Sequence, residues 1–184
     1  TRLQGDWSSD VCSSNLRREG WKLPEGHDEW PQFDQEVLGC RYVGHHGNHA
    51  RTGVSTFVQV APQAASDPAA AALVADLPTQ EFEVPSWLYK CQPLGAKATL
   101  LLSGRAGDRK PVEPVAWTNV SSGGGRVFCT TLGHPDDFKL PAFQLLLYRG
   151  VYWAAGLPIP RSLPSSVGKA AAFLRAPELL EVVP

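Results

Sequence analysis

Short stretches of apolar and polar residues follow one another along the chain and predict a fold of brief strands and helices. Residues 53–61 (GVSTFVQVA) alternate apolar and polar side chains and are rich in β-branched residues, which favours a strand. Residues 97–104 (KATLLLSG) form a continuous apolar run, which is typical of a strand buried on both faces. Pro85 interrupts the extended stretch at 82–89 (FEVPSWLY), so we expect an edge strand or a loop there.

Two short helices are predicted in the first half of the chain. Residues 32–39 (QFDQEVLG) place three apolar side chains at helical spacing, and Gly39 is suited to the helix end. Asp67 and Pro68 form a typical helix start, an N-cap residue followed by proline at the first helical position. The alanine-rich residues 69–77 continue that helix.

A strand hairpin and a longer helix are predicted in the second half. Strands at Val115–Val120 and Arg126–Leu132 flank a Ser/Gly loop of hairpin length. Apolar residues then recur at helical spacing before Gly156, and they are Phe143, Leu146, Leu147, Gly150, Val151 and Ala154. From 157 to 184 the chain is proline-rich, with at most one short helix around Lys169–Arg175.

Composition narrows the class of protein. The 184 residues carry a formal net charge of −1, which gives no electrostatic signature of a nucleic-acid or anionic-membrane partner. No stretch approaches the roughly 20 apolar residues that span a bilayer. The 4 cysteines form no C-x-x-C pair, which excludes a zinc ribbon and argues against a disulfide scaffold.

The first residues differ in character from the rest. The sequence contains no Met, and its opening TRLQGDWSSDVCSSNL has no apolar periodicity. We therefore expect residues 1–16 to be a non-native or disordered leader, residues 17–160 to be the C-terminal part of one domain, and residues 161–184 to be a tail.

Two sequence blocks resemble the trehalose-utilisation (ThuA-like) family. The stretch at 113–156, EPVAWTNVSSGGGRVFCTTLGHPDDFKLPAFQLLLYRGVYWAAG, is similar to the family's C-terminal signature, and EWPQFDQEVLGCRYVGHHGNHA at 29–50 is similar to an upstream block. The resemblance extends from about Trp21 to Pro160. Two departures are Cys40, where a second Gly is common, and 86–89 (SWLY), which replaces an acidic "DE-x-Y".

The resemblance carries expectations about fold and function. It implies an α/β fold, the flavodoxin-like three-layer sandwich of class I glutamine amidotransferases, built on a parallel sheet. The first strands of such a sheet would precede Trp21, so the domain is expected to be incomplete. The implied role is carbohydrate utilisation of the trehalose-disaccharide type, with an unsettled reaction.

His134 is the strongest candidate for chemistry, because it directly follows a predicted strand and open α/β folds place their sites at such ends. In glutamine amidotransferases the corresponding strand ends in HPE, and here His134, Pro135 and Asp136 follow. Asp136 could orient the imidazole as a catalytic partner, or it could simply cap the following turn. Asp137 is expected to contact ligand beside them. None of the cysteines has the strand-to-helix elbow that a nucleophile of this fold requires, so a glutaminase is disfavoured.

A second cluster contains His45, His46 and His49 in a Gly-rich loop. Imidazoles can ligate transition metals, but the spacing is not helical and no carboxylate lies at a diagnostic distance, so polar contacts to sugar hydroxyls are favoured over a metal site. Trp87 and Tyr89 are the aromatic residues best placed to contact a ligand, since Trp117 and Trp153 fall in core patterns.

Three functions remain open at this stage. The first is a ThuA-like protein of carbohydrate utilisation with a small-molecule sugar as partner, either an enzyme of unsettled chemistry or a sugar-binding partner of one. The second is a noncatalytic amidotransferase-like scaffold or sugar-binding module, and the third is a metal-dependent hydrolase using His45, His46 and His49. No cofactor is expected, neither a nucleic-acid nor a membrane partner is expected, and a homo-oligomer is compatible with the sequence. The compartment is left undetermined, with cytoplasmic and secreted or periplasmic locations both compatible.

Overall fold

The computed structural model describes residue 26 and residues 30–46, 55–108 and 112–165. In chain order the elements are η1 (Asp34–Leu38), β1 (Thr56–Val60), η2 (Pro62–Ser66), α2 (Pro68–Val74), β2 (Phe82–Val84), β3 (Thr99–Ala106), β4 (Glu113–Val120), β5 (Arg126–Thr130), η3 (Asp137–Lys139) and α3 (Pro141–Ala154). The predicted leader, His49 and the short helix predicted near residue 170 lie outside the described residues.

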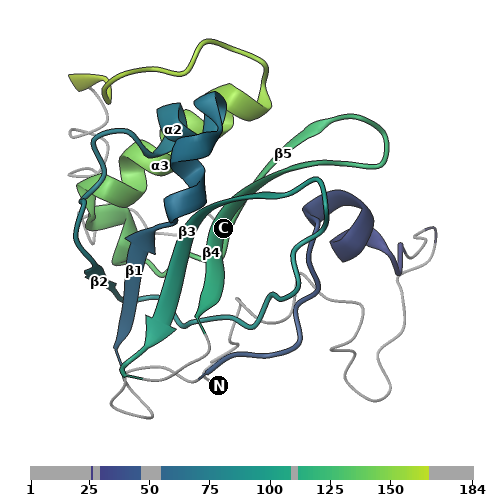
Figure 1. The fold of residues 1–184 in the computed structure, drawn as a ribbon, viewed down its shortest axis with the longest axis horizontal. Coiled ribbons are helices and arrows are strands. Elements are labelled where there is room, and N and C mark those ends of the chain that lie inside the picture. The colour runs from purple at the N-terminus through teal and green to yellow at the C-terminus, as the bar shows by residue number, and fades with distance from the viewer. Residues whose placement is uncertain (1–25, 27–29, 47–54, 109–111, 166–184) are drawn as a thin grey trace, which may run out of the picture.

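The strands form one sheet in the order β2-β1-β3-β4-β5 (Figure 1). Every neighbouring pair in this sheet is antiparallel, whereas the family resemblance implied a parallel sheet. The described part of the chain is therefore mixed α/β with an antiparallel sheet. The physical reason is visible at β4 and β5, where the short Ser121–Gly125 loop reverses the chain, because a parallel pair would need a long crossover connection.

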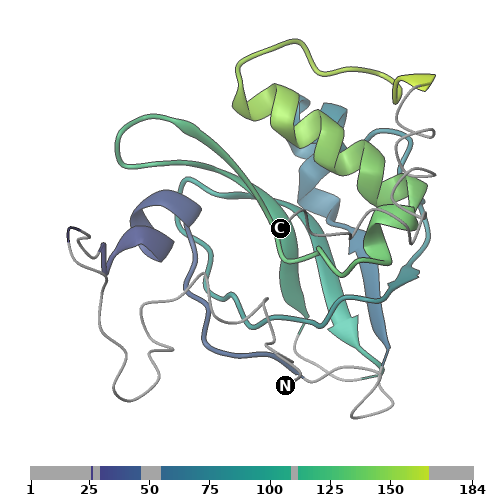
Figure 2. The same cartoon turned by 180° about the vertical axis from the view of Figure 1, so that it is seen from behind.

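Both faces of the sheet are covered, as the apolar run at 97–104 predicts. Helices α2 and α3 pack together on one face, and the chain around η1 lies beside β4 and β5 (Figures 1 and 2). Successive residues of β4 contribute to the cores on opposite faces of the sheet. Ala116 belongs to the larger core under the helices, and Trp117 belongs to a smaller cluster with Cys40 and Cys91. Leu101 and Leu102 of β3 are also fully buried.

Local sequence signals place the helices where they were expected. The Asp67 side chain accepts a hydrogen bond from the Ala70 backbone N–H at 2.7 Å and so caps α2. Gly39 ends η1, a single π-helical turn, with a left-handed φ of 74°. Most of the predicted stripe of α3 faces the sheet, but Val151 is 57% exposed and its predicted place in the core is wrong.

β2 lies at the edge of the sheet, as Pro85 just beyond it predicts. No helix in the described ranges has the length and apolar character needed to cross a bilayer.

Candidate functional site

Most of the polar candidate residues predicted from the sequence lie at one end of the sheet, where β1 and β4 begin and β2, β3 and β5 finish. Thr56, at the start of β1, pairs with Val84 at the end of β2 and with Ala106 at the end of β3. Glu113, at the start of β4, pairs with Gly104 near the end of β3, and β5 returns along β4 to the same end of the sheet. The segments that follow β2 and β5, the two outer strands, therefore leave at the same end of the sheet, and they meet where the Ser86 hydroxyl contacts the backbone N–H groups of Gly133 and His134.

His45 lies against the segment that follows β2. It forms an isolated bridge with Tyr89, and its ring centroid lies 4.6 Å from that of Trp87 and 6.4 Å from that of Tyr89. Tyr42 continues the cluster, with its ring centroid 5.1 Å from that of Tyr89. The structure thus brings together His45, Trp87 and Tyr89, which the sequence suggested as ligand contacts and which lie in two separate segments of the chain.

His46 has a different partner from its neighbour. Its Nε2 lies 2.8 Å from Oε1 of Glu113, and the two side chains are 14% and 4% exposed. The other oxygen of Glu113 accepts a hydrogen bond from Gln92 Nε2 at 3.2 Å. Sequence reasoning missed Glu113 and Gln92. The one available signal was a charged residue at the first position of a strand that is otherwise buried.

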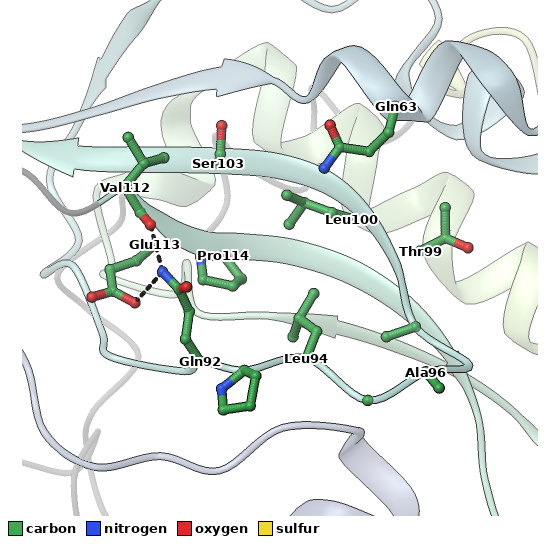
Figure 3. Close-up of a pocket in the computed structure, with 13 residues that line it drawn as sticks. Gln63, Gln92, Leu94, Ala96, Thr99, Leu100, Ser103, Val112, Glu113 and Pro114 are labelled. Carbon is green, nitrogen blue, oxygen red and sulfur yellow. Dashed lines mark hydrogen bonds between the residues drawn. The ribbon is translucent and has the colours of Figure 1, made fainter.

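Glu113 and Gln92 also line a groove of about 610 Å³ beside β3 and β4. Figure 3 shows Gln92 directed toward Glu113 and the carbonyl of Val112, with Leu94 and Leu100 farther along the groove. The volume is within the usual range for small-molecule sites.

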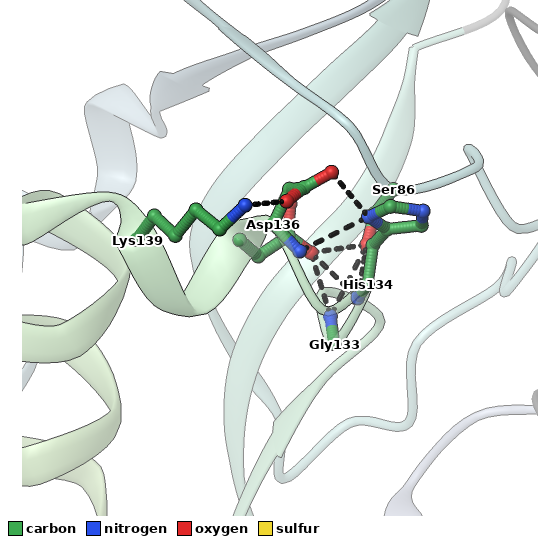
Figure 4. A network of polar contacts seen from close by, with 6 residues as sticks. Ser86, Gly133, His134, Asp136 and Lys139 are labelled. Atoms are coloured by element: carbon green, nitrogen blue, oxygen red, sulfur yellow. Dashed lines mark hydrogen bonds and ion pairs between the residues drawn. The ribbon is translucent and has the colours of Figure 1, made fainter. Parts of the chain in front are cut away.

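The turn after β5 is organised by Asp137, which is completely buried. Its Oδ2 accepts hydrogen bonds from the backbone N–H groups of Gly133, at 2.8 Å, and His134, at 2.9 Å, and from the hydroxyl of Ser86 (Figure 4). The same two N–H groups lie 3.1 Å from the Ser86 oxygen. Asp137 was expected to contact ligand, but its burial favours a role in positioning the turn that carries His134.

His134 itself is 42% exposed at the tip of this turn. Its Nδ1 accepts a hydrogen bond from the backbone N–H of Asp136 at 3.1 Å, so the neutral ring carries its proton on Nε2. The Asp136 carboxylate lies 3.7 Å from Nδ1, too far for a hydrogen bond, and it pairs instead with Lys139. The hydrogen bond and charge of Lys139 lower the pKa of Asp136 below its usual value.

This geometry differs from a base held by a carboxylate. In such a dyad the carboxylate accepts the Nδ1 proton and leaves Nε2 as the base. Here Nδ1 is the acceptor, and Nε2 is the hydrogen-bond donor that the ring offers to a ligand oxygen. In this tautomer Nε2 of His134 can donate a hydrogen bond, whereas His46 is the histidine with a carboxylate at hydrogen-bonding distance.

Cys40, Cys91 and Cys129 are all buried and line a second cavity of about 340 Å³ on the Trp117 side of the sheet. A hydrogen bond between the thiols of Cys40 and Cys91 lowers the pKa of Cys40 and raises that of Cys91, and burial raises the latter further. Of these three described cysteines, none occupies a strand-to-helix elbow, in line with the expectation from sequence.

The predicted alternative of a metal site gains no geometric support where the structure can be assessed. Within residues 30–46, 55–108 and 112–165, no three His, Cys, Asp or Glu side chains are placed to hold an ion. His45 and His46 engage different partners, and His49 lies outside these ranges.

Together these features define an α/β protein with a polar and aromatic candidate site at one end of its sheet. The family profile of ThuA, described as trehalose utilisation, matches residues 23–154, and the chain belongs to this family. The match confirms the resemblance carried by the two sequence blocks. No curated protein and no solved structure gives a significant match to the chain.

Proposed function

We propose that this protein acts in carbohydrate utilisation by binding a trehalose-type disaccharide. The proposed site is the end of the sheet near which His45, Trp87, Tyr89 and His134 lie. The observation that carries the proposal is the ring contact of His45 with Trp87, 4.6 Å between centroids, in a chain of the ThuA family. An aromatic face can pack on the apolar face of a sugar ring, and imidazole nitrogens can hydrogen-bond its hydroxyls.

Ser86 connects the two halves of this site. Its side chain contacts the backbone N–H groups of Gly133 and His134, and the next residue along the chain is Trp87. A ligand that packs on Trp87 would therefore lie close to the turn that carries His134. The exposed Nε2 of His134 would supply a hydrogen-bond donor to a hydroxyl oxygen.

The function proposed is binding of the sugar, and the three-layer, amidotransferase-like arrangement is proposed for the family domain as a whole. A sugar-binding module is favoured over the metal-dependent hydrolase because His45 and His46 contact different partners, Trp87 and Glu113. Among the described residues, no three His, Cys, Asp or Glu side chains are placed to hold an ion.

Calorimetric titration of the full chain with trehalose, sucrose and a non-sugar polyol such as glycerol tests the proposal. We expect the disaccharides to bind and glycerol to give no saturable signal. Trp87→Ala should weaken disaccharide binding about tenfold, roughly 1.4 kcal/mol. Trp30→Ala is the matched control, because Trp30 is an exposed tryptophan whose indole N–H pairs with Glu36, and its removal should leave binding unchanged. Equal losses in the two variants, or no saturable binding by the wild type, would contradict the proposal.

A further inference from the structure

We infer that the groove beside β3 and β4 is a subsite for an uncharged polyhydroxylated ligand and that Glu113 is the hydrogen-bond acceptor that anchors it. The inference rests on the proposed carbohydrate function and extends it to residues to which the sequence analysis assigned no role. It starts from three observations, namely the burial of Glu113, the two side chains that fix its carboxylate, and the character of the groove wall.

The carboxylate of Glu113 is fixed but not saturated. The His46 Nε2 at 2.8 Å and the Gln92 Nε2 at 3.2 Å each engage one of its oxygens. A carboxylate has about four lone-pair positions, so acceptor capacity remains on both oxygens. Because the side chain is only 4% exposed and lines the groove, the natural donors for that capacity are groups of a bound ligand.

The rest of the groove suits a polyol. Its wall alternates polar groups that can both donate and accept hydrogen bonds, Gln63, Thr99 and Ser103, with the apolar side chains of Leu94 and Leu100 (Figure 3). Sugars present the same alternation, hydroxyls around the ring edge and C–H groups on its faces. A neutral sugar would therefore pair the polar groups and bury the apolar ones in a single pose.

Charge within the groove argues against a phosphorylated sugar. Among the described residues that line it, Glu113 is the one acidic or basic side chain, and its carboxylate accepts a hydrogen bond from Gln92. A phosphate placed there would be repelled at short range in a partly desolvated site. The groove is therefore selective for uncharged sugars over their phosphate esters.

A short chain of contacts links the site proposed above to the groove residue Glu113. The backbone N–H of His46 donates to the carbonyl of Leu88 at 2.9 Å, and Leu88 lies between Trp87 and Tyr89 in the chain. His45 and His46 thus join the aromatic cluster to Glu113. One ring of a disaccharide at the aromatic cluster and the other in the groove would use both parts of the site.

The test is a titration of the full chain with trehalose and with trehalose 6-phosphate, for the wild type and three variants. We expect the wild type to bind trehalose at least about tenfold more tightly than the phosphate ester. Glu113→Gln, which keeps the side-chain shape and removes the charge, should lower trehalose affinity about tenfold and reduce the preference over the phosphate ester. A purely structural role for Glu113 would not change that preference.

Gln63→Ala provides a second measurement that does not depend on the folding of a buried variant, because Gln63 is exposed at the groove rim. It should weaken trehalose binding about threefold, whereas Gln59→Ala, at an exposed position of β1 outside the groove, should have no effect. If the wild type binds neither disaccharide, the proposed function fails together with this inference. If it binds trehalose and Trp87→Ala weakens binding while the groove variants do not, the proposed function stands and the groove inference is overturned. A wild-type preference for the phosphate ester also overturns it.

Discussion

The hydroxyl of Ser86 donates a hydrogen bond to the buried carboxylate of Asp137, although 51 positions separate the two residues. Through this contact the segment leaving β2, which continues into Trp87, is tied to the turn after β5, which carries His134. The relative position of the two halves of the proposed sugar site therefore depends on one serine and one aspartate.

Asp137→Ala should lower the free energy of unfolding by about 2–4 kcal/mol, because it removes the completely buried carboxylate that accepts from the N–H groups of Gly133 and His134. Denaturation in urea measures the loss. Asp136→Ala is the matched control, since its carboxylate is 48% exposed, and we expect a change within about 0.5 kcal/mol. Equal effects of the two substitutions would show that Asp137 does not organise the turn.

Arg149→Met should also be destabilising, by about 3–4 kcal/mol, although Met fits a helix well. The Arg149 guanidinium is buried on α3 and donates to the backbone carbonyls of Ala75, Pro160 and Arg161. Removing it leaves these acceptors unpaired and loosens α2 and the chain after α3. The comparison is with Arg126→Met, an exposed arginine with one bond to the Trp153 carbonyl, which should cost much less in the same unfolding experiment.

Gly150→Ala should destabilise the protein by about 1–2 kcal/mol despite an expected gain of about 1 kcal/mol in helix propensity. A Cβ at Gly150 would lie 2.5 Å from ring carbons of Phe128, and the ring is held between α3 and the sheet. Thermal unfolding of the single variant and of Gly150→Ala combined with Phe128→Leu checks the cause. If the smaller side chain at 128 does not recover part of the loss, the close contact is not its origin.

Asp34 should make stability depend on pH. Burial raises its pKa, partly offset by a backbone hydrogen bond from Tyr42 and the charge of Arg41, and its Oδ2 has no hydrogen-bond partner among the residues that the structure describes. With the native pKa above the unfolded value of about 3.9, its stabilising contribution is present below about pH 3.9 and is lost as pH rises through the native pKa.

Asp34→Asn removes this proton linkage. The free energy of unfolding of the Asp34→Asn variant minus that of the wild type should therefore increase as pH rises from about 4 to 7. Urea denaturation of both proteins at several pH values measures the trend. Gln35→Ala, on the same helical turn and at an exposed position, controls for disturbance of η1 and should show a constant difference. A constant difference for Asp34→Asn as well would contradict a raised pKa.

Much of the local structure could be predicted from sequence, because it depends on neighbouring residues. The Asp67 cap, the left-handed Gly39, the hairpin around the Ser/Gly loop and the edge position of β2 all follow from short-range rules. The two-sided burial of β3 follows from its continuous apolar run. The position of His134 in the turn that follows β5 is also a local property.

The candidate site was predicted less completely. The sequence singled out His45, Trp87 and Tyr89, and the structure brings them together, but their roles in ligand binding stay a prediction. It made Asp136 a catalytic partner and Asp137 a ligand contact, whereas the structure leaves Asp136 exposed beside Lys139 and buries Asp137 completely. Adjacent residues in a turn point in different directions, and composition alone does not say which one faces inward.

By itself, the sequence determined the class of element at most positions and the family, since these depend on residue type and near neighbours. The tertiary structure alone decided that the strands pair antiparallel and that His46 meets Glu113, 67 positions away, at the end of a groove. Such pairings are selected by the joint burial of distant apolar surfaces and by the need to satisfy buried polar groups. Both are properties of the whole packed chain, and no local pattern contains them.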